Sequence, residues 1–162
     1  MYYITNPQEL EIAEHYLRLT SEEARKSSCI KSQRGAVIVK ENKIIGRGYN
    51  KVTDESFCNP CVRKEIHDNS RVELCSAIHA EQMAIIDGIN SKEYLEGSRM
   101  YHAQLKRGKI VRRGEPSCSV CSKMLYEAKI EIVLPQKKDF IVYSPEEFNK
   151  LSLDYVLNRY RR

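Results

Sequence analysis

The sequence predicts one mixed α/β domain. Its 162 residues alternate between stretches of helical periodicity and short β-rich stretches, and no internal repeat, linker or low-complexity tract separates them. The length suits a single domain with a substantial core. The expected order of the main elements is helix, strand, strand, helix, strand, helix, strand.

The first half of the chain is predicted to hold a helix, a hairpin and a long loop. Residues from about 7 to 28 form an amphipathic helix that Pro7 can begin, with apolar side chains near helical spacing at Leu10, Ala13, Tyr16, Leu17 and Ala24. Two β-rich runs within 35–49 surround the polar turn 41–43 and indicate a hairpin. Residues 51–75 have no periodicity and contain three cysteines, so we expect a loop that a metal holds in place.

The second half is predicted to carry two helices between strands, followed by a C-terminal helix. A helix over about 75–89 would bury Ala80, Met83, Ala84 and Ile86. The other expected elements are a strand from Gly97, an extended basic arm over 106–113, a helix over 118–128, strands at 130–134 and 139–143, and a helix that begins within 144–147.

A candidate catalytic metal site is formed by His79, Cys118 and Cys121. One imidazole and two thiolates are three zinc ligands, and they leave the fourth tetrahedral position open for water. Each set of ligands is expected at a helix N-terminus, where the helix dipole lowers the pKa of thiols. Glu81 is two residues from the histidine and is better placed to move protons than to bind the metal. A purely structural zinc site is the alternative, but it would require a fourth protein ligand.

Four further cysteines stand outside this site: Cys29, Cys58, Cys61 and Cys75. The pair Cys58 and Cys61 has the spacing of a zinc knuckle, and the other two complete a set of four sulfurs. The sequence therefore predicts a second, structural zinc, in which His67 can replace one cysteine. The alternative is that the four are buried, reduced side chains that pack as small apolar groups. His15 and His102 are expected to be structural or solvent-facing.

The charge and composition restrict the partners only loosely. The chain has 27 Lys and Arg against 22 Asp and Glu, a formal net charge of +5, with basic clusters at 106–113 and 159–162. This excess is compatible with a phosphorylated small substrate, with nucleic acid, or with solvated surface. We expect a cytoplasmic protein, because the sequence has no secretory signal and no stretch as long as a membrane span, and its cysteines suit metal binding better than disulfides.

The motifs resemble those of the cytidine deaminase superfamily, and most closely those of its deoxycytidylate (dCMP) deaminase branch. His79-Ala-Glu-Gln followed by Pro116 and Cys118-x-x-Cys121 is similar to the zinc deaminase signature. The branch's first strand is matched by residues 27–39, its sugar-recognising strand end by 48–50, and its run into the active-site histidine by 73–82. The resemblance covers about residues 24–134.

The resemblance implies a fold, a reaction and a set of contacts. The fold would have three layers, with a central mixed sheet of about five strands flanked by helices. The reaction would be the zinc-dependent conversion of dCMP to dUMP with release of ammonia. Asn50 would bind the sugar, the backbone amide of Ala80 would lie near the base, and Arg34 would lie near a 5′-phosphate. Some members of the branch carry a second structural zinc, and family behaviour implies a homo-oligomer.

Departures from the family pattern leave the substrate open. Ser117 separates Pro116 from the first cysteine, Lys51 stands where glycine is common, and Met83 stands where asparagine is frequent. The basic arm over 106–113 is an insertion relative to the shortest relatives. One alternative is therefore a deaminase of another base or of adenosine in tRNA, for which the arm would bind RNA. The other is a catalytically silent zinc-binding module, which would have no need of Glu81.

Overall fold

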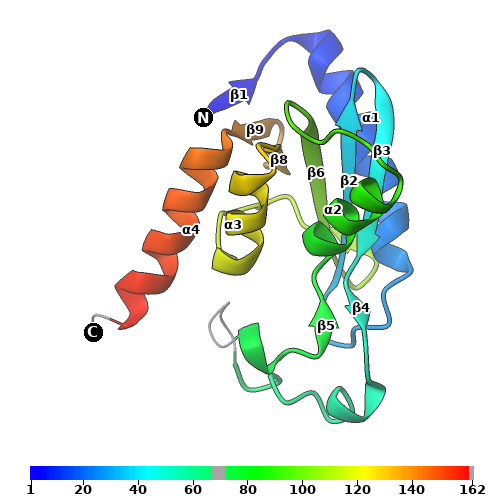
Figure 1. The fold of residues 1–162 in the computed structure, drawn as a ribbon, viewed down its shortest axis with the longest axis vertical. Coiled ribbons are helices and arrows are strands. Elements are labelled where there is room, and N and C mark those ends of the chain that lie inside the picture. Colours follow the sequence, from blue (N-terminus) through cyan, green and yellow to red (C-terminus); the bar gives the residue numbers. More distant parts are fainter. Residues whose placement is uncertain (67–71, 161–162) are drawn as a thin grey trace.

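The structure, a computed structural model, describes residues 1–66 and 72–160 (Figure 1). The helices are α1 (Pro7–Arg25), α2 (Ala80–Asn90), α3 (Ser119–Glu127) and α4 (Pro145–Tyr160), and two short 3-10 turns lie at Glu55–Phe57 and Val72–Leu74. The strands are β1 (Tyr2–Ile4), β2 (Gln33–Lys40), β3 (Lys43–Tyr49), β4 (Lys51–Val52), β5 (Ala77–Ile78), β6 (Arg99–Lys106), β7 (Lys109–Ile110), β8 (Glu131–Pro135) and β9 (Phe140–Tyr143).

The central sheet is mixed, as predicted. Its strand order is β1-β9-β8-β6-β2-β3, with the short β7 paired to the end of β6. The β6–β8 pair is parallel and the other pairs are antiparallel. Five strands form the predicted core of the sheet, and β1 and β7 are short additions at its margins. A separate two-stranded ribbon, β4 with β5, leads out of the sheet toward the 53–75 segment.

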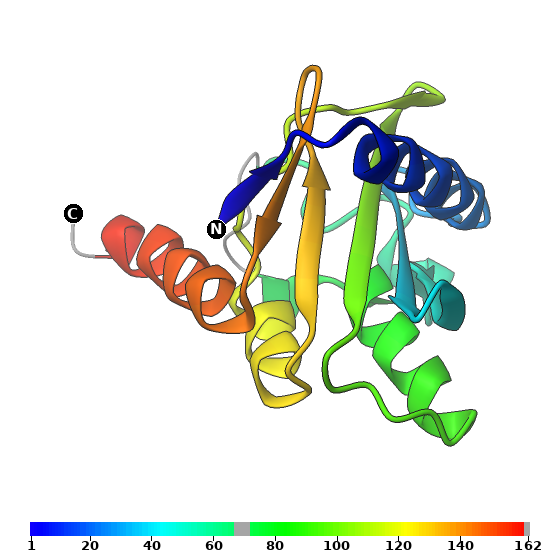
Figure 2. The same cartoon turned by 90° about the horizontal axis from the view of Figure 1, so that it is seen from above.

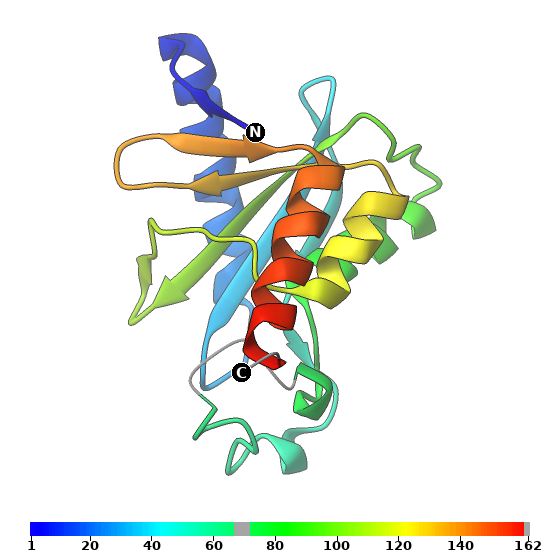
Figure 3. The ribbon, with the colours of Figure 1, turned by 90° about the vertical axis from the view of Figure 1, so that its left-hand side faces the viewer.

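Helices cover both faces of the sheet and complete the predicted three-layer fold (Figure 2). On one face α1 buries Ala13, Tyr16 and Leu17 against alternate residues of the strands, such as Val37 and Tyr101. The opposite face packs against α2 and α3 through a second apolar cluster, which includes Ala36, Ile38, Met100, Ala84 and Leu125. Figure 3 shows α4 lying beside α3 over the β8–β9 end of this face. None of the described helices is long and apolar enough to cross a membrane.

Two glycines of β3 bring the backbone of α2 close to the sheet. A Cβ atom on Gly48 would lie 2.2 Å from the backbone oxygen of Ala80, and one on Gly46 would lie 2.4 Å from that of Ala84. Both contacts are far shorter than real Cβ contacts, so only glycine fits while the helix keeps this position. The helix start, which carries the candidate catalytic residues, is therefore fixed by backbone packing against β3.

The structure corrects the predicted start of α2. The helix begins at Ala80, whereas the sequence predicted a start near Cys75, because Ala77 and Ile78 pair with β4 instead. The buried side of the helix also differs: Ile85 is 3% exposed, while the predicted Ile86 is 45% exposed. The other main elements agree with the prediction within a few residues at each end.

The predicted basic arm is a short hairpin followed by irregular chain. Only Lys109 and Ile110 pair back onto β6, after a tight turn at Arg107 and Gly108. Residues 111–118 have no regular structure, yet several contacts attach them to the domain. Arg112 forms an ion pair with Glu14 of α1, and Gly114 exchanges hydrogen bonds with residues 135–136. The arm therefore runs along the body of the domain toward α3.

Candidate active site

The three predicted metal ligands come together at the N-termini of two helices. His79 is the N-cap residue of α2, and Cys118 is the N-cap residue of α3, with Cys121 in the first turn. The Nδ1 atom of His79 lies 3.1 Å from Sγ of Cys121 and 3.4 Å from Sγ of Cys118, and the two sulfurs are 3.1 Å apart. Among the described residues, this is the one group of three metal-type ligands whose donor atoms all lie within 4.8 Å of one another.

This cluster fits a zinc ion in spacing and in acidity. Tetrahedral zinc keeps nitrogen and sulfur ligands roughly 3.5–3.8 Å apart, so binding requires the cluster to expand by only about half an ångström. The hydrogen bonds with Cys121 and with His79 lower the pKa of Cys118, against the effect of burial, to about 5. The backbone N–H of Cys121 also donates to the Cys118 sulfur, at 3.3 Å. One thiolate is thus available at neutral pH without an ion.

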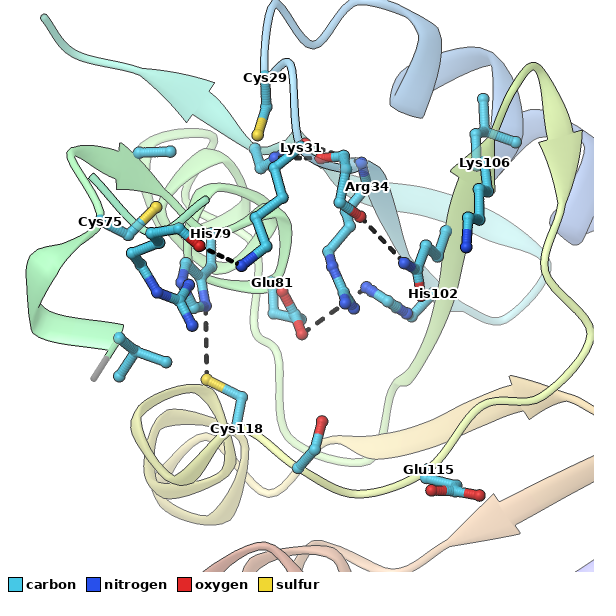
Figure 4. A pocket seen from close by; sticks show the side chains of 18 of the residues that line it. Cys29, Lys31, Arg34, Cys75, His79, Glu81, His102, Lys106, Glu115 and Cys118 are labelled. Carbon is cyan, nitrogen blue, oxygen red and sulfur yellow. Dashed lines mark hydrogen bonds and ion pairs between the residues drawn. The ribbon is translucent and has the colours of Figure 1, made fainter. Parts of the chain in front are cut away.

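Glu81 lies beside the ligands in the first turn of α2. Its side chain is nearly inaccessible, and its Oε2 atom is buried without a hydrogen-bond partner among residues 1–66 and 72–160. Burial raises the pKa of Glu81, but the neighbouring His102, His79 and Arg34 and a backbone hydrogen bond together outweigh burial and lower it. Figure 4 shows the carboxylate directed into the space between His79, Arg34 and His102. A carboxylate held there without a protein partner is available for a ligand.

These groups line one cavity of about 340 Å³. Its walls come from the loop before β2, the ends of β2, β3 and β6, the start of α2 and the loop before α3. A second cavity of about 130 Å³ shares Arg34, His102 and Gln104 with the first and adds Arg113 and Tyr155. The volume of the first cavity is in the range of sites that bind a small ligand.

The predicted substrate contacts are distributed unevenly around the cavity. Arg34 lines both cavities, and Figure 4 shows its side chain reaching toward Glu81 and His102. Asn50 is buried and lines the first cavity, where its carboxamide accepts from the backbone N–H of Arg34 at 2.7 Å and donates to the Ser32 carbonyl at 2.8 Å. These two hydrogen bonds hold the loop before β2 in its conformation. Ala80 is fully buried as the first residue of α2.

The four remaining cysteines line the same cavity but do not form a compact cluster. All of them are free thiols with partly exposed side chains, and they lie outside the helices. The backbones of Cys58 and Cys61 form an isolated antiparallel β-bridge, and the Cys58 sulfur lies 3.2 Å from the Ser76 hydroxyl. His67, the alternative ligand, lies outside the described residues. The predicted second zinc thus has its candidate ligands on one wall of the cavity, without a preformed site.

His102 is the site residue that the sequence reasoning missed. It was expected to be structural or solvent-facing on a strand leading away from the pocket, but it is 8% exposed and lines both cavities. Its Nε2 atom lies 3.8 Å from Oε1 of Glu81. Both faces of β6 are buried, so its sequence shows no alternation of polar and apolar residues. The sequence therefore could not indicate which face His102 occupies. His15 is exposed on α1, in agreement with the prediction.

Comparison with known proteins identifies the family. A profile described as the cytidine and deoxycytidylate deaminase zinc-binding region matches residues 10–135. The deoxycytidylate deaminase of Mycobacterium phage D29 is 30% identical over 133 residues, which cover 77% of this chain and 94% of the phage protein. The deoxycytidylate deaminase of Saccharomyces cerevisiae is 30% identical over 76 residues, which cover 45% of this chain and 24% of the yeast protein.

The solved structures agree with this relationship. The crystal structure of dCMP deaminase from the cyanophage S-TIM5 in apo form matches 79% of this chain and 84% of its own chain, with a TM-score of 0.52 and 25% identity. The same enzyme in complex with dCMP and dUMP matches with a TM-score of 0.52 and 24% identity over 79% of this chain and 82% of its own. The profile match spans both ligand motifs and Glu81. The chain therefore belongs to the cytidine and deoxycytidylate deaminase family, in its deoxycytidylate deaminase branch.

Proposed function

We propose that the protein converts dCMP to dUMP by zinc-dependent hydrolysis with release of ammonia. The observation that carries this proposal is the position of Glu81, whose buried carboxylate has an unpartnered Oε2 atom and lines the same cavity as His79 and Cys118 of the His/Cys/Cys cluster. A silent zinc-binding module has no use for such a carboxylate, because burying it without a partner costs free energy. Both curated relatives bear the name deoxycytidylate deaminase, and a structural relative was solved with dCMP and dUMP.

The three candidate zinc ligands and Glu81 each have a role in this reaction. His79, Cys118 and Cys121 would hold the zinc, and the open fourth position would admit water. When bound, zinc supplies Lewis-acid activation of water at neutral pH. Glu81 would accept a proton as water attacks C4 of the cytosine ring and would deliver it to the ring nitrogen. It would then take the proton of the new C4 hydroxyl and deliver it to the amine, which leaves as ammonia while the C4 carbonyl forms. The burial of the carboxylate limits competition from bulk water.

The second cavity suits the phosphate of a nucleotide. Arg34 and Arg113 both line it, and Lys106 lines the adjoining first cavity. Guanidinium groups bind phosphate oxygens with paired, charge-assisted hydrogen bonds. Glu115 also lines this space and would favour a partly protonated or cation-shielded phosphate. We therefore assign the base to the cavity beside Glu81 and the phosphate to the Arg34 side, with the sugar near Asn50.

We also propose a structural zinc at Cys29, Cys58, Cys61 and Cys75. The four side chains line one cavity wall and come from three separate loop segments, so an ion would join those segments. Lys31 already contacts this region, since its ammonium donates to the backbone oxygens of Arg63, at 2.6 Å, and Ile66. The ion would fix the shape of this part of the cavity lining.

The test is ammonia release from a panel of amino-heterocycles by the zinc-loaded protein. The panel contains cytosine, cytidine, deoxycytidine, CMP, dCMP, adenosine, guanine and a tRNA anticodon stem-loop. We expect turnover of dCMP above all others, and a loss of roughly 10²- to 10⁴-fold in the Glu81→Gln variant. Turnover restricted to the stem-loop, with steep salt dependence, would show an RNA-editing enzyme instead. No turnover of any substrate by a protein with bound zinc would contradict the proposed activity.

A further inference from the structure

The proposed chemistry leaves one buried polar side chain of the cavity without a role, namely His102 of β6. Along this strand Met100, His102 and Gln104 alternate with residues that face α1. Met100 lies in the apolar cluster beneath α2, and Gln104 lines the cavity at the strand end. His102 therefore stands where the apolar core meets the catalytic cavity, and Figure 4 shows its ring directed toward Glu81.

The Nε2 atom of His102 has no hydrogen-bond partner in the part of the chain that the structure describes. It is buried, as is Oε2 of Glu81, and both atoms lack a partner among the described residues. An unsatisfied buried polar atom destabilises a fold. An apolar side chain of similar size would fill this position without that cost. The placement of an imidazole here thus favours a function within the cavity over simple packing.

His102 is a neutral imidazole at physiological pH. Burial lowers the pKa of His102, and the nearby Glu81 carboxylate raises it. The lowering is larger, so the pKa is about 4. A neutral imidazole carries one N–H donor and one acceptor nitrogen. It can therefore hold a carboxylate by a hydrogen bond without neutralising its charge, so the carboxylate remains able to accept a proton.

We propose that His102 is a positioning residue, which donates a hydrogen bond from Nε2 to Oε1 of Glu81 and leaves Oε2 facing the reacting atoms. The proposal rests on the catalytic role of Glu81 proposed above. Nε2 now lies 3.8 Å from Oε1, so a movement of about 1 Å forms the bond. Catalytic hydrogen bonds are often this long before a substrate is bound. The hydrogen bond to Oε1 fixes the orientation of the carboxylate, so Oε2 points toward the atoms that exchange the proton.

A matched pair of substitutions separates the hydrogen bond from the shape of the side chain. Glutamine and methionine have nearly the same length and volume, but only glutamine retains a donor close to the position of Nε2. We expect His102→Met to lower kcat for dCMP roughly 10- to 100-fold, as loss of a supporting partner does elsewhere. KM should change by less than about twofold, since substrate binding is not removed. His102→Gln should recover most of the loss, with both variants folded as judged by thermal melting.

The opposite results would overturn the proposal. Equal kcat values in the two variants would show that the position contributes shape alone. A rise in KM that accounts for the whole effect would show that His102 contacts the substrate directly. The binding of dCMP to a Glu81→Gln protein distinguishes these cases further. Adding His102→Met should leave that affinity unchanged, whereas a weaker affinity would assign His102 to the substrate.

A spectroscopic measurement tests the contact without any turnover. The chain has four histidines, so the ¹⁵N signals of the zinc-loaded protein can be assigned by single substitutions. We expect a neutral His102 protonated at Nε2, with a proton that exchanges slowly with water, and faster exchange in Glu81→Ala. Protonation at Nδ1 alone, or a signal that Glu81→Ala does not alter, would contradict the hydrogen bond. This result stands even if dCMP proves not to be the substrate.

Discussion

The two cysteine groups share the Cys-x-x-Cys spacing but differ in what supports them. Cys118 and Cys121 begin α3 and meet His79 at the start of α2, and the three donor atoms lie 3.1–3.4 Å apart. The loop cysteines, which are Cys29, Cys58, Cys61 and Cys75, come from segments outside the helices and do not gather into a comparable group. Packed helix ends organise ligands in advance, whereas loops require the ion to order them.

The difference implies separate tasks for the two proposed metal ions. A catalytic site must hold its geometry while a ligand position stays open, which requires a rigid frame. That frame is built by the contact of α2 with β3 and of α3 with α4. A structural ion needs only to bind strongly enough to hold its ligands together. We therefore expect substitutions in the group of His79, Cys118 and Cys121 to lower activity, and substitutions of the loop cysteines to lower stability. The substitutions below test this expectation and the contacts around the catalytic group.

The largest effect is expected from Cys121→Ala. This change removes a catalytic ligand, and the Lewis-acid contribution of zinc is worth several kcal/mol, so activity should fall by at least about 10³-fold. The α-helical signal and the melting temperature should change little, because the helices pack through their apolar residues. Zinc content and ammonia release measure the two parts of this prediction. A variant that keeps its activity would refute the assignment of the ligands.

The next largest effect is expected from Cys58→Ser, and it should fall on stability. An ion that joins distant loop segments acts as a cross-link, worth about 2–4 kcal/mol. For a chain of this size the melting temperature should fall by roughly 4–16 °C, with the loss of one zinc per chain. Cys118→Ser is the matched comparison, since it should lose the other ion and the activity instead. An unchanged zinc content in Cys58→Ser would remove the structural site from the account.

Arg34→Ala should produce a smaller effect that depends on the substrate. Loss of a charge-assisted hydrogen bond to phosphate costs about 1.5–3 kcal/mol, so KM for dCMP should rise roughly 10- to 100-fold. Deoxycytidine has no phosphate and serves as the internal control, because its kcat/KM should change far less. An equal loss for both substrates would place Arg34 near the base or would show a general distortion of the cavity.

The smallest effect is expected from Gly48→Ala, which disturbs the frame of the catalytic group. The added Cβ would meet the backbone of Ala80 and force α2 away from β3. Overpacking of this kind destabilises a fold by about 1–3 kcal/mol, and the shift of Glu81 should also lower kcat. Thermal melting and steady-state kinetics measure both changes, and zinc bound by the loop cysteines should be retained. Normal kcat in this variant would show that α2 tolerates displacement.

The sequence predicted the site better than it predicted the ends of the elements. His79, Cys118 and Cys121 were recognisable because ligand type and spacing are local properties, and both sets do begin helices. The start of α2 was placed too early because residues 75–79 fit a helical pattern, and only their pairing with β4 excludes it. β1 was not predicted either, since Tyr2–Ile4 become a strand through pairing with β9.

The part of the site that escaped prediction depends on tertiary contacts. His102 and Glu81 are 21 positions apart, and nothing in the sequence indicates that β6 passes next to the start of α2. Tyr155 likewise reaches the second cavity only because α4 packs along α3. Asn50 was predicted near the sugar, but its hydrogen bonds to the loop before β2 appear only in the folded chain. Local motifs identify ligands, whereas the neighbours of those ligands require the fold.

The most direct test of the central claim is the recovery of dCMP turnover as zinc is added back to chelator-stripped protein, with Glu81→Gln measured in parallel. We predict no ammonia release without zinc, and a return of activity that saturates at no more than two equivalents per chain. The variant should bind zinc equally and remain at least about 10²-fold less active. Full turnover by the stripped protein, or equal recovery in the Glu81→Gln variant, would contradict a zinc site served by Glu81.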